Sequence, residues 1–141
     1  MAEHKFDVFI SHAQADSPEA RRLADELRSA GKSVFLDDYG LAAGDDWEHS
    51  LSASLEQSAS AVVLVSCNSL TSQFSSYEMG MTLGHANRTP GFNVVPVVLD
   101  DVAASALPAP LRSIHRVDVS KTWDGAAEAI SRALEPEEPV R

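Results

Sequence analysis

The run Ala61-Val-Val-Leu-Val65 is apolar at every position and rich in β-branched side chains. A strand of this kind is typical of the centre of a parallel sheet, where helices cover both faces and exclude water. Parallel strands need crossover connections, so the run also predicts helices between successive strands. This one segment therefore points the chain toward an α/β fold.

The rest of the sequence supplies the alternation of strands and helices that such a fold requires. Predicted strands are Phe6–Ile10, Ser33–Leu36, Ala61–Val65, Val94–Leu99 and Arg116–Val119. Four helices are predicted. The first starts at Ser17-Pro18, with Ser17 as the N-cap, and stops at Gly31. The second buries Trp47, Leu51 and Leu55, the third runs from about Ser76 to Ala86, and the last places Trp123, Ala127, Ile130 and Leu134 on one face. Pro96 removes one ladder donor, which predicts an edge-like or irregular fourth strand.

We therefore expect a single flavodoxin-like α/β domain over residues 1–135, with an acidic, proline-containing tail or linker stub at 136–141. Its five-stranded parallel sheet should have the order 2-1-3-4-5, with helices on both faces. That order brings the carboxyl ends of the first and third strands together, where open α/β sheets bind ligands. The loops expected there are Ser11–Asp16 and Cys67–Ser76, and the second leads directly to Glu78.

Composition excludes several classes of partner. The chain has 141 residues and a formal net charge of −10 at pH 7, which argues against a nucleic acid or an anionic membrane as the main partner. No apolar run approaches the length of a membrane span, so we expect a cytoplasmic protein. The single cysteine, Cys67, excludes an internal disulfide and is expected to be a small packing residue at a strand end. The histidines show no metal-ligand spacing, so no metal site is predicted.

Four segments of the chain form a series. They are Phe6-Asp-Val-Phe-Ile-Ser-His-Ala13, Ser33-Val-Phe-Leu-Asp-Asp38 with Leu41-Ala-Ala-Gly-Asp-Asp-Trp47, Ala61-Val-Val-Leu-Val-Ser66, and Phe74-Ser-Ser-Tyr-Glu-Met-Gly-Met-Thr-Leu83. Taken together, they resemble Toll/interleukin-receptor (TIR) domains of the bacterial, NAD-cleaving type. Each segment alone is a weak signal, but their order and spacing are those of the family. The resemblance extends from about Lys5 to Leu134.

The resemblance implies an NAD glycohydrolase that releases nicotinamide and ADP-ribose, or a cyclic ADP-ribose product, in bacterial defence or signalling. It maps Glu78 onto the catalytic glutamate, with NAD as substrate and no cofactor. The implied substrate-binding residues are Ser11, His12, Ala13, Asp38, Trp47, Phe74 and Tyr77. It further implies self-association through the BB loop, here Gly40, Leu41, Ala42, Ala43, Gly44, Asp45 and Asp46, and activation by a partner or sensor protein. The family more often has tryptophan at the position of Phe74 and an arginine in the first loop, which this chain lacks before Arg21.

Other interpretations of the same residues stay open. Glu78 could be an acid in the first turn of a helix, Trp47 an anchor of the apolar stripe, His12 a loop histidine with a structural hydrogen bond, and His85 a solvent-facing side chain. A TIR–TIR interaction or adaptor-mimic module would share every feature of the fold. A nucleoside-processing transferase would also use a glutamate on ribose. A response-regulator receiver is excluded, because Ser66-Cys67 stands where its phospho-acceptor aspartate would be.

Overall fold

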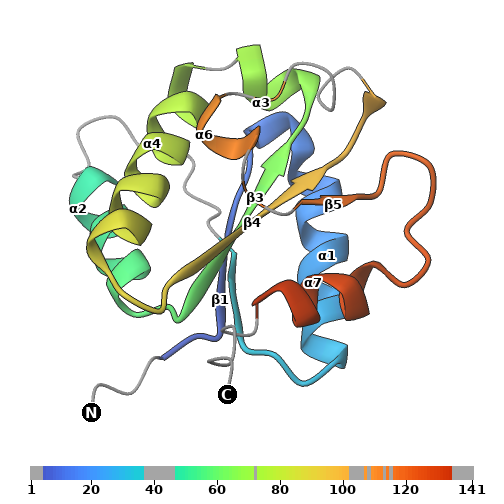
Figure 1. The fold of residues 1–141 in the computed structure, drawn as a ribbon, viewed down its shortest axis with the longest axis horizontal. Helices are drawn as coiled ribbons and strands as arrows, with labels where there is room; N and C mark the ends of the chain where they lie inside the picture. Colours follow the sequence, from blue (N-terminus) through green and yellow to red (C-terminus); the bar gives the residue numbers. More distant parts are fainter. Residues whose placement is uncertain are drawn as a thin grey trace, which may run out of the picture.

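A five-stranded parallel sheet forms the centre of the molecule (Figure 1). The computed structural model describes residues 5–36, 47–71, 73–101, 107, 109–112, 114 and 116–134, and gives only the backbone for 47–50, 71, 73–78 and 110. The strands are β1 (Val8–Ser11), β2 (Val34–Leu36), β3 (Ser60–Val65), β4 (Asn93–Val98) and β5 (Val117–Asp118). Their order is β2-β1-β3-β4-β5, and every neighbouring pair is parallel. The predicted fold class is confirmed.

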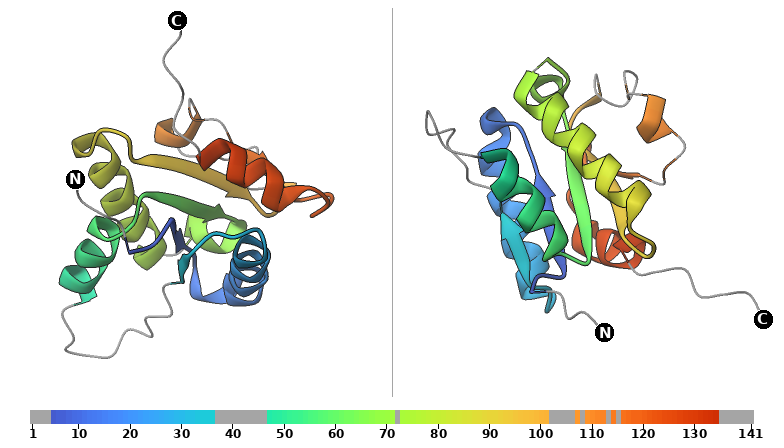
Figure 2. Two further views of the ribbon diagram at one scale, coloured as in Figure 1. Left: turned by 90° about the horizontal axis from the view of Figure 1, so that it is seen from below. Right: turned by 90° about the vertical axis from the view of Figure 1, so that its left-hand side faces the viewer.

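Helices cover both faces of this sheet (Figure 2). They are η1 (Gln14–Asp16), α1 (Ser17–Ser29), α2 (Trp47–Glu56), α3 (Cys67–Thr71), α4 (Gln73–Arg88), α6 (Ala109–Arg112) and α7 (Ala126–Leu134). Helices α1 and α7 pack on one face, while α2, α4 and α6 lie on the other.

Strand β3 supplies side chains to both layers of the core. All six of its residues are buried, as the continuous apolar run predicts. Val62 and Leu64 point toward α1 and α7, whereas Ala61, Val63 and Val65 point toward α2 and α4. This is the two-residue alternation of a strand, here with water excluded from both sides.

Helix α1 follows its predicted boundaries closely. Its first residue is Ser17, so the N-cap is Asp16 rather than the predicted Ser17. Leu23 and Leu27 are fully buried on its inner face. The chain leaves the helix through Gly31, whose φ of +93° lies in the left-handed region that glycine adopts without strain.

Strand β4 is not an edge strand, so the prediction from Pro96 is wrong. β4 lies between β3 and β5, and Pro96 is in register with Val63. Leu99 donates its N–H to Val65 of β3 at 2.9 Å, and donors on a parallel strand alternate between neighbours. The missing donor at position 96, three residues earlier, therefore faces the β5 side, where β5 pairs only with Val97 and Val98. The proline is tolerated because no partner on β4's β5 side depends on its N–H.

Two helices begin elsewhere than predicted. Helix α4 starts at Gln73, three residues before the expected Ser76, so Glu78 is its sixth residue and not in its first turn. Helix α7 starts at Ala126, which leaves Trp123 in the preceding turn. Gly125, with φ +72°, has a backbone conformation that a right-handed helix excludes, and it separates Trp123 from the helix.

Candidate functional site

The carboxyl ends of β1 and β3 meet through Asp16 and the residues that follow Ser66. The Asp16 carboxylate accepts one hydrogen bond from the Ser66 hydroxyl and another, of 2.9 Å, from the Asn68 amide. Asp16 is only 4% exposed and Ser66 2%. The strand order predicts that these two loops converge, and the contacts confirm it.

Serine side chains fix the start of α3 at this point. The Ser66 N–H donates to the Ser69 hydroxyl at 2.8 Å, and the Ser69 N–H donates to the Ser66 hydroxyl at 3.1 Å. The segment from Cys67, expected to be a loop, is therefore a short helix. Cys67 itself is exposed, so its prediction as a packing residue is wrong.

Strand β4 also contributes a carboxylate to this edge. Asp100 follows β4 and accepts a hydrogen bond of 2.9 Å from the Cys67 N–H. Together, Asp16 and Asp100 connect the start of α3 to the strands on either side of β3. Sequence reasoning missed both contacts, although polar residues directly after buried strands were a readable signal.

Ser11, His12 and Ala13 lie at the end of β1, with side chains 3%, 7% and 3% exposed. The His12 Nε2 atom lies 3.4 Å from the Ser17 hydroxyl, which fits the interpretation of a histidine with a structural hydrogen bond. The N-cap residue of α1 is Asp16, whose carboxylate makes no capping hydrogen bond and bonds instead to Ser66 and Asn68. A negative charge at that position opposes phosphate binding to the helix N-terminus.

The candidate residues after β3 lie on α4. Phe74 and Glu78 are four positions apart on this helix, the spacing that places two residues on one face, and Tyr77 precedes Glu78. Trp47 is the first residue of α2. Asp38 and the predicted BB loop, residues 40–46, lie outside the described residues, as does the predicted tail.

The sequence also singled out His85, which lies on α4. It is half-buried rather than solvent-facing, and its ring lies edge-on to Phe92 with centroids 4.6 Å apart. Its Nε2 atom is 3.4 Å from the Thr89 hydroxyl. These contacts give it a packing role at the end of the helix.

Carboxylates continue along this edge beyond β5. The side chain and the backbone N–H of Ser120 bond to Asp118 and hold the pKa of its carboxyl below the ordinary value. The Ser120 Oγ atom also lies 3.1 Å from Oδ1 of Asp101. Within the described ranges, no group of three or more histidine, cysteine, aspartate or glutamate side chains is arranged to hold a metal ion.

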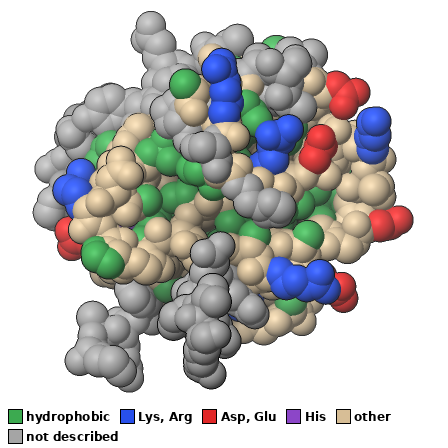
Figure 3. Space-filling view, viewed as in Figure 1, with side chains coloured by type: hydrophobic (Ala, Val, Ile, Leu, Met, Phe, Trp, Pro, Cys, Tyr) green, Lys and Arg blue, Asp and Glu red, His purple; other side chains and the backbone are tan. Residues whose placement is uncertain are grey.

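Charged side chains of both signs lie on one face of the molecule (Figure 3). On the face shown in Figure 3, basic and acidic side chains are interspersed and hydrophobic side chains line the centre. Among the helices that the structure describes, none is both long and apolar enough to span a bilayer.

Residues 8–134 match the family model described as "TIR domain". The chain belongs to the TIR domain family. The resemblance seen in the four sequence segments is thereby confirmed, and the match covers all five strands of the sheet.

Relatives of this TIR domain include signalling proteins and NAD-metabolising enzymes. The chain is 26% identical over 136 residues to "Stimulator of interferon genes protein" of Magallana gigas, with 96% of this chain and 33% of that protein covered. It is 31% identical over 78 residues to "2' cyclic ADP-D-ribose synthase AbTIR" of Acinetobacter baumannii, with 55% and 29% covered. It is 39% identical over 61 residues to "NAD(+) hydrolase PdTIR" of Paracoccus denitrificans, with 43% and 20% covered. The chain thus spans a third or less of the length of these relatives.

Solved structures give the same fold. A metazoan TIR-STING receptor from C. gigas, in complex with 2',3'-cGAMP, superposes with a TM-score of 0.78 at 25% identity, covering 99% of this chain and 43% of that one. The TIR domain of the Toll-related receptor TRR-2 from Hydra magnipapillata superposes with a TM-score of 0.72 at 16% identity, covering 92% and 98%. The second likeness, at this identity, concerns the fold alone.

Proposed function

We propose that this TIR domain cleaves NAD at the bond between nicotinamide and ribose, with Glu78 as the catalytic carboxylate. The observation that carries the proposal is the convergence of the β1 and β3 carboxyl ends at Asp16 and Ser66, from which the chain continues through α3 to α4, the helix that bears Glu78. Relatives named as NAD hydrolases and cyclic ADP-ribose synthases support the reaction class.

One carboxylate is sufficient for this chemistry. Breaking the bond to a cationic pyridinium builds positive charge on the ribose, as in an oxocarbenium ion. A carboxylate beside the sugar stabilises that charge and holds the ribose hydroxyls. Nicotinamide leaves as a neutral molecule, so the reaction needs no acid to protonate the leaving group. Water then gives ADP-ribose, whereas attack by a group of the same molecule gives a cyclic product.

The remaining candidates are assigned to substrate binding. Phe74 and Trp47 would stack on the nicotinamide ring, which an aromatic face favours. Tyr77 and Asp38 would complete the pocket around the ribose. Because Ser11–Ala13 have buried side chains, they would contact the dinucleotide through the backbone.

We further propose that activity depends on self-association through residues 40–46 of a neighbouring copy. The TIR domains of the activated Roq1 resistosome are similar in fold, with a TM-score of 0.67 at 22% identity. A site completed by a second copy predicts a specific activity that rises with protein concentration. An activator protein would act by promoting that association in the cytoplasm.

The test is nicotinamide release from NAD by wild type, Glu78→Ala and Glu56→Ala, with products separated by chromatography. Glu56 is an exposed glutamate at the end of α2, so its replacement controls for the loss of one surface carboxylate. We expect release by wild type and Glu56→Ala, and loss of release in Glu78→Ala with an unchanged circular dichroism spectrum. Equal rates in all three would show that Glu78 is not catalytic.

A second candidate function is signalling through TIR–TIR contacts without catalysis. It is favoured by the match to the Magallana gigas protein, which extends over 96% of this chain. Self-association with no NAD turnover at any protein concentration would support this alternative. Turnover of free nucleosides in preference to NAD would instead identify a nucleoside-processing transferase.

A further inference from the structure

The Asp16 carboxylate is buried without a basic partner. It is 4% exposed, and none of the ion pairs between described residues involves it. Both of its oxygens accept hydrogen bonds from neutral donors, the Ser66 hydroxyl and the Asn68 amide. Burying a charge in this way costs free energy that two neutral hydrogen bonds offset only in part. What the carboxylate provides is a connection between segments far apart in the chain.

The hydrogen-bond partners of Asp16 indicate what that role is. Ser66 and Asn68 flank Cys67, the first residue of α3, and lie 50 and 52 positions from Asp16 in the chain. Asp16 itself is the residue before α1. The contact thus ties the start of α1 to the start of α3, while Asp100 holds the Cys67 N–H from the other side.

Helix α3 passes this constraint to α4. A single residue separates the end of α3 at Thr71 from the start of α4 at Gln73. A displacement of the start of α3 would therefore move the first turns of α4, in which Glu78 lies.

We propose that Asp16 is a positioning residue whose carboxylate fixes the location of the α4 segment that carries Glu78. The predicted effect on kcat rests on the proposed function, whereas the predicted effect on the backbone position of α3 and α4 does not. Since misplacement of a reacting group by about 1 Å can cost on the order of 100-fold in rate, Asp16→Asn should lower kcat by roughly 10- to 100-fold with KM nearly unchanged.

Exchanging the side chains of Asp16 and Asn68 distinguishes the effect of the hydrogen bond between them from the effect of a charge at position 16. In Asp16→Asn the amide oxygen accepts from Asn68, and the Ser66 hydroxyl must accept from the new NH₂ instead of donating, so two charge-assisted hydrogen bonds become weaker neutral ones. In Asp16→Asn/Asn68→Asp the amide oxygen accepts from Ser66, and the amide NH₂ donates to the new carboxylate. The double variant should recover most of the lost kcat, because the tie is restored with the charge on the other residue.

Hydrogen exchange provides a readout that does not need activity. Backbone amides of residues 67–78 should exchange faster in Asp16→Asn, and the double variant should restore their protection. Asn68→Ala, at an exposed residue, breaks the same tie and should show the same local effect if Asp16→Asn fails to fold. Asp7→Asn is the matched control, since Asp7 Oδ2 accepts the Ser33 N–H at 2.8 Å at the opposite edge of the sheet.

Each outcome decides the proposal. A kcat loss in Asp16→Asn that the double variant reverses and Asp7→Asn does not share supports it. A loss of kcat that the double variant fails to reverse, with normal hydrogen exchange in residues 67–78, would overturn the proposal and indicate that the charge of Asp16 acts directly. An equal loss of kcat in Asp7→Asn would contradict the proposal, because it would show that the effect comes from a general loss of stability. If wild type shows no turnover, the proposed function fails, and unchanged exchange in Asp16→Asn would overturn the positioning role as well.

Discussion

Asn68 donates a hydrogen bond of 2.9 Å to the carboxylate of Asp16, although the two residues are 52 positions apart. This contact joins the loop after β1 to the segment after β3, the pair of strand ends between which the sheet order reverses. Ligand sites of open α/β sheets form at this position because the connecting loops diverge there. The contact therefore lies where the candidate site is expected, and it connects the starts of α1 and α3.

The two layers of the core should respond strongly to truncation. Leu55 is 1% exposed and packs with Leu51 of α2 against the sheet. Leu55→Ala should lower the free energy of unfolding by about 2–5 kcal/mol, from lost burial and the cavity left behind. Urea unfolding followed by circular dichroism measures this, with exposed Glu56→Ala as the control that should change it by less than about 0.5 kcal/mol.

Two glycine-to-alanine substitutions should change the free energy of unfolding in opposite directions. Gly31 has φ +93°, and an added methyl group meets nothing within 4 Å, so Gly31→Ala costs only backbone strain, about 1–2 kcal/mol. Gly80 lies in the interior of α4 with equally open space and ordinary helical φ. Gly80→Ala should therefore raise the free energy of unfolding by about 0.5–1 kcal/mol. Thermal unfolding of the pair checks both signs, and a destabilised Gly80→Ala would contradict the helical assignment of that position.

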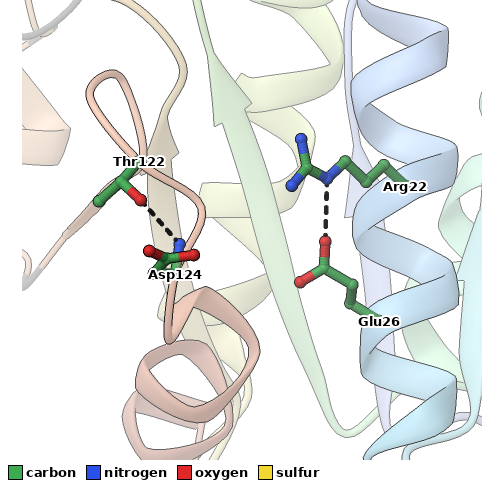
Figure 4. A network of polar contacts seen from close by, with 4 residues as sticks. All are labelled: Arg22, Glu26, Thr122 and Asp124. Atoms are coloured by element: carbon green, nitrogen blue, oxygen red, sulfur yellow. Dashed lines mark hydrogen bonds and ion pairs between the residues drawn. The ribbon is translucent and has the colours of Figure 1, made fainter.

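Arg22 of α1 contacts the turn before α7 through Trp123. Its guanidinium carbon lies 4.3 Å from the centroid of the Trp123 ring. Its Nε also donates to Glu26 at 3.0 Å, as Figure 4 shows. A double-mutant cycle with Arg22→Ala and Trp123→Leu should give a coupling of about 0.5–1 kcal/mol. Glu26→Gln should change stability by less, since that pair is exposed. Zero coupling would mean that the ring and the cation do not interact in solution.

The pKa of Asp118 offers a test of the edge beyond β5. Hydrogen bonds from the Ser120 side chain and backbone lower it from the ordinary value of 3.8. A lowered pKa in the folded state means that the interaction stabilises the protein above about pH 4 and that this contribution is lost as the pH falls through the folded pKa.

Ser120→Ala should accordingly raise the pKa of Asp118 part of the way back, because the backbone N–H, at 2.8 Å, remains. An NMR titration of the Asp118 carboxyl carbon measures the change. Thr122→Ala is the control, since that hydroxyl bonds to the Asp124 N–H at 3.1 Å instead (Figure 4). An equal shift in both variants would assign the effect to the turn as a whole.

The strands could be predicted from sequence because their signal is local. The run that became β3 is apolar throughout, and every one of its residues is buried. Helix starts were less accurate, since nothing in Gln73–Ser76 breaks a helix and α4 extends back over it. The start of α7 is set by the φ of Gly125, which the spacing of apolar residues does not encode.

The site was predictable in place but not in detail. The sheet order predicts that the loops after β1 and β3 converge, and the structure confirms that they meet at Asp16 and Ser66. The burial of Asp16 and the exposure of Cys67 depend on partners 33 to 52 residues away in the chain, and no local pattern specifies such pairs. The roles of Glu78 and the substrate-binding residues stay predictions.

The most direct measurement is the rate of nicotinamide release by Glu78→Gln compared with wild type, at one high protein concentration. Glutamine keeps the size of the side chain and removes its charge, so folding and self-association should be unaffected. We predict a fall of at least about 100-fold, as for removal of a group that stabilises charge in the transition state. A rate within about two-fold of a wild-type enzyme that does turn over NAD would contradict the assignment of Glu78, and with it the central claim.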